Sequence, residues 1–372
     1  MSQTTKWIVG VIIAVVVVAV GYSVIKGPSA PKETGPIKIG LSSPMSGEAA
    51  SYGEAFFGGA ALAVKEINDA GGINGRKIEL IVEDDKCSAD GATAINKLAN
   101  VDKVTAIVGP LCSAAAGPGA PIAQNAGVPS IIVASAPGLT KAGNYIFRDY
   151  PSDAVQGKFA AEFIYENLGK RKAAVIYVKN DWGQGIRDVF VKRFKELGGE
   201  VVYDESILQD STDLRTQIAK AKAANPDALY FPVYPQNSVA GLKQISEMGL
   251  DAVIVGGDAF ADDTIAKLPE AEGALYTVAK TNNPKDFQEK VKQVSGKNPN
   301  VFTPYAYDAV KILAKVMEKA GADPRAIRDE LAQISYKDAI SLPVIEFDEN
   351  GDLKTAEFEV KVVKNGKTED YK

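Results

Sequence analysis

The sequence contains no histidine, the side chain that enzymes use most often as a general base and that proteins use most often as a metal ligand. Cysteine is almost as scarce, with only Cys87 and Cys112 among 372 residues, and no serine lies in a G-x-S-x-G elbow. These absences exclude the commonest catalytic sites. The sequence therefore predicts a protein that is not an enzyme, with no cofactor and no metal site.

Two short segments have a superficial likeness to known binding loops. Gly366-Lys367-Thr368 matches the end of a phosphate-binding loop, but Lys361 stands where the first glycine of that loop is required. Residues 348–352 (DENGD) have the acidic character of a calcium loop but lack its later glutamate, so a turn between strands is the better interpretation. Neither segment predicts a nucleotide or a cation.

Positive charge is never concentrated. The formal net charge is -5, and lysine and arginine are scattered along the chain, so no surface that follows a phosphate backbone is indicated. Nucleic acid is excluded as a partner on this ground. The apolar fraction of 46% is that of an ordinary globular protein, whose body we expect to be monomeric. Because 372 residues exceed the roughly 250 at which one core stops growing, two lobes are expected.

The first 26 residues differ from the rest. Between Lys6 and Lys26 lie 19 residues, of which only Tyr22 and Ser23 are neither apolar nor small. This length suffices for a transmembrane helix, whereas the apolar part of a signal peptide usually has about 7 to 15 residues. We expect a single-pass N-terminal anchor in the cell membrane, with the body outside the cytoplasm, periplasmic or at the cell surface. Secretion after signal cleavage, for which 19–21 (AVG) offers a site, is the alternative.

Residues 27–36 (GPSAPKETGP) have no apolar period and predict an extended linker. After it, short β-branched runs alternate with segments of helical period, which predicts parallel strands covered by helices on both faces. The expected strands are 37–41, 77–83, 104–108 and 129–133, with helices at 52–70, 88–100 and 113–126.

A second series of the same kind follows. Its expected strands are 173–178, 200–206, 228–231 and 252–255, with helices at 185–197, 213–224 and 236–248. The first helix of each series ends in a glycine pair, Gly71-Gly72 and Gly198-Gly199, which permits the left-handed turn that stops a helix. The sequence thus predicts an α/β protein with two similar, doubly wound parallel-sheet lobes. Further helices are expected at 284–295, 303–320 and 324–334, and final strands at 342–347 and 356–364.

The two cysteines have two interpretations when taken alone. A single pair in an exported chain indicates a disulfide, which would close a loop of about 25 residues. Two buried free thiols are the alternative, because free cysteine is often part of a core.

Several segments resemble the leucine/isoleucine/valine-binding proteins of ABC importers, in order and over nearly everything from Ile37 onward. The segments are Ile39-Gly40-Leu41, Pro44-Met45-Ser46-Gly47, Tyr52-Gly53, 66–75 (EINDAGGING), Asp84-Asp85-Lys86-Cys87, 108–113 (VGPLCS), 303–309 (TPYAYDA) and 347–353 (FDENGDL). The resemblance implies a type I periplasmic-binding fold, in which a three-strand hinge joins two lobes around a ligand cleft. It also implies the pairing of Cys87 with Cys112.

The same resemblance implies the domain organisation and the partners. The first lobe is expected to comprise 37–153 with 282–342, and the second lobe and hinge 154–281 with 343–372. The implied function is the extracytoplasmic receptor of an ABC importer, which closes on a small amino acid, branched-chain or otherwise apolar, and presents itself to the permease subunits. A membrane-anchored amino-acid or amide sensor or scavenger of the same fold is the alternative.

The resemblance also implies where each end of an amino acid binds. Ser113 matches a serine that contacts the ligand carboxylate, at a helix start that favours an anion, although alone it would be interpreted as an N-cap. Ser135 matches a threonine that touches polar groups of the ligand, and Val133 or Ala134 is expected to contribute backbone contacts. Asp258, where the family carries an acidic residue and more often glutamate, is expected to bind the ammonium.

Aromatic residues complete the expected site. Tyr234 matches a tyrosine that contacts the ligand, with packing under a loop as the alternative. Trp182 and Tyr52 fall where the family places aromatics at the mouth of the cleft, either over an apolar side chain or at the rim. Phe302 and Tyr305 are weaker candidates.

Overall fold

The computed structural model describes residues 35–372, so the predicted transmembrane helix and most of the predicted linker lie outside the described residues. Within 35–372, no helix has the combination of length and apolar character that a bilayer crossing requires. Residues 37–372 form one compact unit that contains two parallel sheets.

The first sheet has five parallel strands in the order β2-β1-β3-β4-β5. Alternate residues of a strand face opposite sides, and both sides are apolar here: Val108 and Ile131 pack in one core with α2, whereas Ile107 and Ile132 pack in another with α4. Its elements are β1 (Ile37–Ser43), α2 (Ala50–Asp69), β2 (Ile78–Asp84), α3 (Gly91–Asn96), β3 (Ala106–Val108), α4 (Ser113–Ala126), β4 (Ser130–Ile132) and β5 (Ile146–Arg148).

The second sheet has seven strands in the order β14-β13-β10-β9-β8-β6-β7, of which β13 and β14 run antiparallel to their neighbours. It too has a core on each face: Leu229 and Phe231 pack with α7 and α8, and Ala228 and Tyr230 with α5 and α6. Its elements are α5 (Asp153–Glu162), β6 (Lys172–Val178), α6 (Asp181–Glu196), β7 (Glu200–Ile207), α7 (Arg215–Ala223), β8 (Ala228–Phe231), α8 (Pro235–Met248), β9 (Val253–Gly256), α9 (Asp263–Ala266), β10 (Leu275–Ala279), β13 (Phe358–Lys364) and β14 (Lys367–Asp370).

The parallel parts of the two sheets have the same strand order. In both, the second strand of the series lies outside the first, and the third, fourth and fifth follow on the other side, as β2-β1-β3-β4-β5 and β7-β6-β8-β9-β10. The glycine pairs agree with this repeat, because Gly71 (φ 110°) and Gly198 (φ 94°) both adopt the left-handed conformation after the first helix of their series. The predicted internal similarity is therefore present in the topology.

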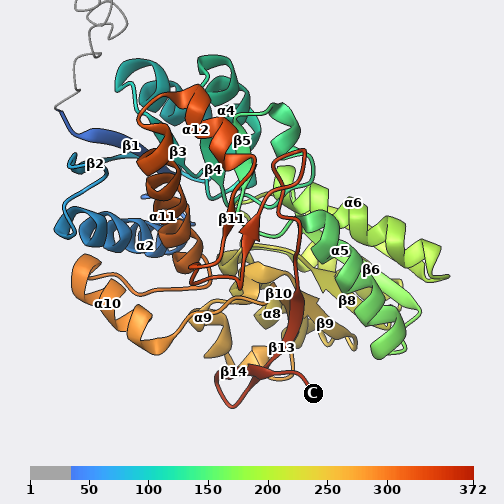
Figure 1. Cartoon of the computed structure of the whole chain (residues 1–372). Helices are drawn as coiled ribbons and strands as arrows, with labels where there is room; N and C mark the ends of the chain where they lie inside the picture. Colours follow the sequence, from blue (N-terminus) through green and yellow to red (C-terminus); the bar gives the residue numbers. More distant parts are fainter. Residues whose placement is uncertain (1–34) are drawn as a thin grey trace, which may run out of the picture. The chain divides into compact units, whose positions relative to one another are not determined.

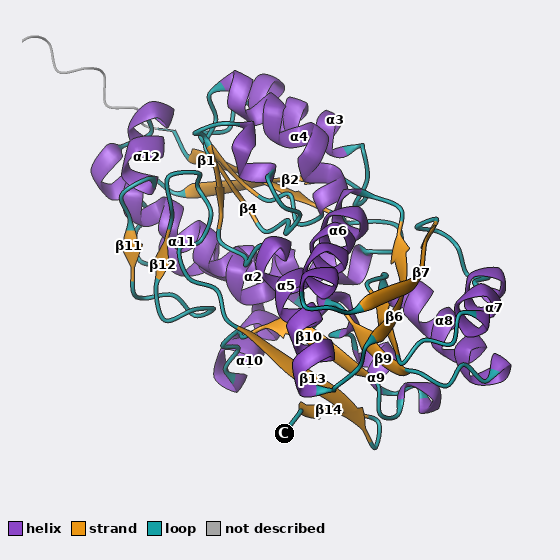
Figure 2. Cartoon of the chain, turned by 90° about the vertical axis from the view of Figure 1, so that its right-hand side faces the viewer, coloured by secondary structure: helices purple, strands orange, loops and turns teal. Residues whose placement is uncertain are grey.

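The chain passes between the two sheets three times, after β5, after β10 and before β13. Between the last two passes it returns to the side of the first sheet, where α10 and α11 pack against α2, and α11 lies beside α2 in Figure 1. Figure 2 shows β1, β2 and β4 grouped apart from β6, β9, β10 and β13. The elements of this return are α10 (Lys285–Ser295), α11 (Thr303–Ala320), α12 (Pro324–Leu331), β11 (Ser335–Tyr336) and β12 (Ile345–Glu346).

Several predicted elements need correction. The helix expected from residue 185 begins at Asp181, because the Asn180 side chain accepts a hydrogen bond from the Gly183 N–H and caps it. The strand expected over 342–347 contains only Ile345–Glu346, which pairs with Ser335–Tyr336 in a separate two-stranded sheet. Helix α5 and strands β5, β10, β11 and β14 are absent from the sequence-based prediction.

Candidate functional site

A cavity lies between the two sheets, and most of its lining follows directly on the carboxyl ends of strands. This is the position at which open α/β sheets bind ligands. Within the cavity, the centre of a water molecule can occupy a volume of about 40 Å³. Its lining comprises Tyr52, Leu111, Cys112, Ser113, Val133, Ser135, Tyr150, Trp182, Tyr234, Asp258, Ala259 and Phe302.

Of the seven residues predicted from the sequence to bind the ligand, six line this one cavity and Ala134 does not. The Ala134 N–H donates to the Pro110 carbonyl, and its own carbonyl accepts from Arg148, so its backbone groups are used within the protein. Val133, the alternative for that role, does line the cavity, as does the weaker candidate Phe302. Tyr305 does not; it packs behind the lining residue Tyr150.

Ser113 is the first residue of α4, and it is not the N-cap, which is Cys112. Its Oγ accepts a hydrogen bond from the Ala136 N–H (3.1 Å), so the hydroxyl hydrogen remains free to donate. The start of α4 also carries unpaired N–H groups and the positive end of the helix dipole. This end of the cavity is suited to a carboxylate.

A disulfide fixes the residue before Ser113. Cys87, just past β2, is bonded to Cys112 with a Cα–Cα distance of 5.2 Å, as predicted, and the two cysteines are therefore not free thiols. Both residues are buried, and Cys112 lines the cavity. The bond ties the loops after β2 and β3 together at the place where α4 begins.

Ser135, in the loop after β4, has the opposite hydrogen-bonding state to Ser113. Its Oγ donates to Asp153 Oδ2 (2.9 Å), and its carbonyl accepts from the Asp153 N–H (2.8 Å). The hydroxyl hydrogen is therefore committed, and only lone pairs face the cavity. Ser135 can accept a hydrogen bond there but not donate one.

Asp258 supplies a buried carboxylate to the cavity from the side of the second sheet. It follows β9 in the turn Asp258–Phe260 and is 4% exposed. Burial raises the pKa of Asp258 to about 6, and the hydrogen bond from Tyr150 opposes that rise. Burial and the neighbouring charge of Asp258 also hold the pKa of Asp153 well above its usual range. Asp258 thus lines the cavity as a poorly solvated acid, with Asp153 bonded to the lining residue Ser135, and a cation in the cavity would relieve the desolvation of Asp258.

The remaining wall is apolar or aromatic, and each of the hydroxyl groups of Tyr52 and Tyr234 already makes one hydrogen bond within the protein. The Tyr52 hydroxyl donates to the Ala259 carbonyl (2.8 Å), a contact between the two sides of the cavity. The Tyr234 hydroxyl accepts from Asn180 Nδ2 (3.2 Å), and its ring stacks on Trp182 with centroids 5.0 Å apart. Trp182 and Tyr52 are each 5% exposed, so they form the inner wall and not an exposed rim.

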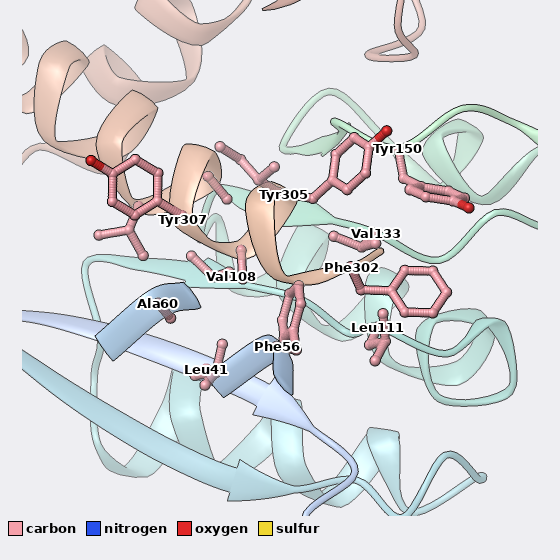
Figure 3. Packing of buried hydrophobic residues seen from close by; sticks show 14 of the residues in the cluster. Leu41, Phe56, Ala60, Val108, Leu111, Val133, Tyr150, Phe302, Tyr305 and Tyr307 are labelled. Atoms are coloured by element: carbon pink, nitrogen blue, oxygen red, sulfur yellow. The ribbon is translucent and has the colours of Figure 1, made fainter. Parts of the chain in front are cut away.

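Three lining residues, Leu111, Tyr150 and Ala259, were not identified as candidates from the sequence. In Figure 3, Leu111 and Val133 lie near Phe302, and Tyr150 lies near Tyr305. Tyr150 follows β5, a strand of three residues, and its partner Asp258 is 108 positions away. A polar aromatic residue directly after a strand of the first series was the only available signal.

Comparison with known proteins gives a consistent result. A family model described as "Periplasmic binding protein" matches residues 36–367. A leucine-, isoleucine-, valine-, threonine- and alanine-binding protein of Pseudomonas aeruginosa is 34% identical over 338 residues, which are 87% of this chain and 89% of that protein. A Leu/Ile/Val-binding protein of Escherichia coli is 32% identical over 87% of this chain and 90% of its own length.

Solved structures with the same fold include a branched-chain amino-acid binding protein of Streptococcus pneumoniae in complex with isoleucine. It has a TM-score of 0.80 at 30% identity, over 90% of this chain and 98% of that one. A leucine-binding protein of Thermotoga maritima has a TM-score of 0.82 at 28% identity, over the same shares. A solute-binding protein of Rhodopseudomonas palustris in complex with benzoate (TM-score 0.80, 21% identity, 90% of this chain and 95% of that one) shares the fold.

Proposed function

The chain belongs to the periplasmic binding protein family, and we propose that it is the extracytoplasmic receptor of an ABC importer for a small, apolar α-amino acid. Members of this family bind solutes and do not catalyse reactions, in agreement with the absence of histidine. Relatives and structural neighbours are named for branched-chain amino acids, which supports a ligand of that class.

The polarity of the cavity is the observation that carries this proposal. From the side of the first sheet, Ser113 offers a free hydroxyl hydrogen beside a helix start, and Ser135, next to Ala136, offers only lone pairs. From the side of the second sheet, Asp258 adds a buried carboxylate. A zwitterionic α-amino acid matches this combination, because its carboxylate accepts only and its ammonium donates only. A carboxylic acid without an amino group would leave Asp258 buried and unpaired.

The apolar wall supports an apolar side chain on the ligand. The Tyr52 hydroxyl donates its hydrogen to Ala259 and the Tyr234 hydroxyl accepts from Asn180, so each keeps only part of its hydrogen-bonding capacity for a ligand. Leu111, Trp182 and Phe302 add carbon surface. A polar ligand side chain that buries a group without a partner against this carbon surface would lose about 1–3 kcal/mol.

The domain organisation is part of the proposal. We assign 37–153 with 282–342 to a first lobe and 154–281 with 343–372 to a second lobe, with the three chain passes between the sheets as the hinge. The contacts Tyr52–Ala259 and Tyr150–Asp258 join residues from the two sides of the cavity, as a closed state requires. The two-lobed, hinged form would let a ligand enter and then be enclosed.

The membrane tether is likewise proposed from the sequence. Residues 7–25 would hold the body at the outer side of the cell membrane, with 27–36 as the spacer and the permease subunits as partners. Membrane fractionation with a carbonate wash distinguishes an uncleaved anchor, which stays in the pellet, from a secreted form. N-terminal sequencing that begins after residue 21 would identify cleavage.

Isothermal titration calorimetry of the body, residues 37–372, tests the binding proposal. Leucine, isoleucine, valine and alanine are titrated beside 4-methylpentanoate, leucinamide and benzoate. We expect tight binding of at least one α-amino acid, and weaker but measurable binding when either the ammonium or the carboxylate of that ligand is absent. Binding of benzoate with no binding of any α-amino acid would overturn the proposal.

A further inference from the structure

Tyr150 lies in the segment that carries the chain from β5 to α5, and it is 1% exposed. Its ring is held edge-on against Tyr305 (centroids 4.9 Å apart, 73° between planes) and tilted against Phe302 (5.4 Å, 49°). These contacts hold the ring, and Tyr150 lines the cavity together with Asp258, the partner of its hydroxyl. The position of the hydroxyl group is therefore set by packing and not by a ligand.

The Tyr150 hydroxyl donates its one hydrogen to Asp258 Oδ2 (2.9 Å). A tyrosine hydroxyl has one donor hydrogen, so only its lone pairs remain for any other group. Ser135 is in the same state, because Asp153 takes its hydrogen. The two hydroxyl oxygens and the Asp258 carboxylate, which line one cavity, are thus all acceptors toward a ligand.

On the premise of the proposed function, we propose that Tyr150 is a specificity-determining residue that accepts one N–H of the ligand ammonium and holds Asp258 in place for another. With Ser135 as the third acceptor, the site matches the three N–H groups of a primary ammonium. An N-methylated amino acid or proline has two such groups and leaves one acceptor buried without a donor. The ligand class is therefore narrowed to amino acids with an unsubstituted amino group.

Two observations argue against a purely structural role for Tyr150. Tyr305 and Phe302 already pack against its ring, so the hydroxyl is not needed to position it. The hydroxyl also lies against a carboxylate that is almost completely buried, where a donor changes the ionisation of that carboxylate as well as its orientation. The Tyr305 hydroxyl, in contrast, is 2.7 Å from Thr281 Oγ1 and does not line the cavity.

The test compares Tyr150→Phe with Tyr305→Phe, a matched control that removes a buried hydroxyl next to the same ring. Calorimetry measures leucine against N-methylleucine, and alanine against N-methylalanine, on both variants and on the unmodified body. The unmodified body should prefer the primary amine at least about tenfold, the effect of one hydrogen bond to a charged group. Tyr150→Phe should weaken binding of the primary amino acid about 10- to 100-fold and binding of its N-methyl derivative much less. The preference for the primary amine therefore falls. Tyr305→Phe should leave the preference unchanged.

A second readout is the pH profile. Without the donor from Tyr150, the Asp258 carboxylate is protonated more easily, so the pH below which binding weakens should rise in Tyr150→Phe and stay the same in Tyr305→Phe. If Tyr150→Phe retains both the preference and the pH profile, the proposal for Tyr150 is wrong, and the amino-acid receptor stands.

The unmodified body also provides a test that needs no variant. Equal binding of leucine and N-methylleucine, and of alanine and N-methylalanine, would overturn the assignment even if Tyr150→Phe did not fold. If no α-amino acid binds at all, the proposed function itself fails, and the role of Tyr150 fails with it.

Discussion

The two ends of the cavity are built in different ways. At the Ser113 end, a hydrogen bond from the Ala136 N–H positions the hydroxyl oxygen and a disulfide braces the preceding residue, so a donor hydrogen is held ready for a ligand. At the Asp258 end, burial raises the pKa of Asp258 and of the nearby Asp153. The first end thus offers a fixed donor, and the second gains most from a cation. Under the proposed function, the Ser113 end positions the ligand carboxylate and the Asp258 end discriminates at the ammonium.

Among the changes that test the difference between the two ends, Asp258→Ala is expected to have the largest effect on ligand affinity. A buried ammonium without its carboxylate should lose about 3 kcal/mol or more of binding free energy, roughly a hundredfold or more in Kd for leucine. Calorimetry should show no such loss for 4-methylpentanoate, which has no ammonium. An unchanged affinity for leucine would remove Asp258 from the site.

The next largest effect is expected on protein stability, from removal of the disulfide that braces the Ser113 end. In Cys87→Ala/Cys112→Ala, opening a loop with a sequence separation of 25 should lower the free energy of unfolding by about 3 kcal/mol, because the unfolded chain gains conformational freedom. Urea unfolding followed by circular dichroism measures this loss. Dithiothreitol treatment of the unmodified protein is the control and should act in the same direction. A change below about 1 kcal/mol would mean that the bond adds little to the fold.

Ser113→Ala should have a smaller effect on binding and a different ligand dependence. Loss of one hydrogen bond to a carboxylate should reduce the binding free energy of leucine by about 1.5–3 kcal/mol, roughly 10- to 100-fold in affinity. Because 4-methylpentanoate has the same carboxylate, its affinity should fall by a similar factor in Ser113→Ala. In Asp258→Ala, by contrast, its affinity should not fall. If Ser113→Ala affects leucine alone, the assignment of the two ends is wrong.

The smallest effect expected is that of pH. The pKa of Asp258 is about 6 in the ligand-free protein, and an ammonium ligand would lower it by favouring the charged form. Affinity for leucine should therefore be nearly constant above about pH 7 and about tenfold weaker at pH 5, where the free carboxyl is mostly protonated. Asp258→Asn, which cannot titrate, should bind weakly and without this slope in calorimetry between pH 5 and 8.

The stability of the ligand-free protein should respond to pH with the opposite sign. Since the folded pKa of Asp258 lies above the unfolded value of about 3.9, the folded state binds the proton more tightly. The resulting stabilisation is present below the unfolded pKa and is lost as pH rises through the folded pKa. The Tm difference between Asp258→Asn and the unmodified protein should therefore grow from pH 4 to pH 7 in thermal unfolding.

Regular periodicity predicted most of the fold. Helix α4 has the predicted bounds, and strand β8 agrees as well, because apolar runs between turn residues identify buried strands. Helix α5 was missed because it buries Asp153 and Gln156 beside alanines and has no clear apolar face. The start of α6 was hidden by the glycines at 183 and 185, although Asn180 followed by Asp181 is a recognisable capping signal.

From the sequence, the candidate site could be predicted only as a set of single positions that follow strands. Ser113, Ser135, Asp258 and all the predicted aromatics except Tyr305 line one cavity, because chain order fixes which strand ends meet. The hydrogen-bonding state of each serine was not predictable, since it depends on Ala136 for one and on Asp153 for the other. Tyr150 has its partner in a different sheet, and no local pattern records such a pairing.

The buried Arg148 connects the binding loop to the last part of the chain. Its Nη1 donates to the Ala136 carbonyl (2.8 Å), next to Ser135, and its Nε donates to Asp352 (2.8 Å), which is 204 positions later. Asp352 also forms an ion pair with this buried guanidinium. We therefore expect truncation before residue 352 to loosen the loop that carries Ser135 and to make it more sensitive to proteases, although residue 352 lies far from that loop in the sequence.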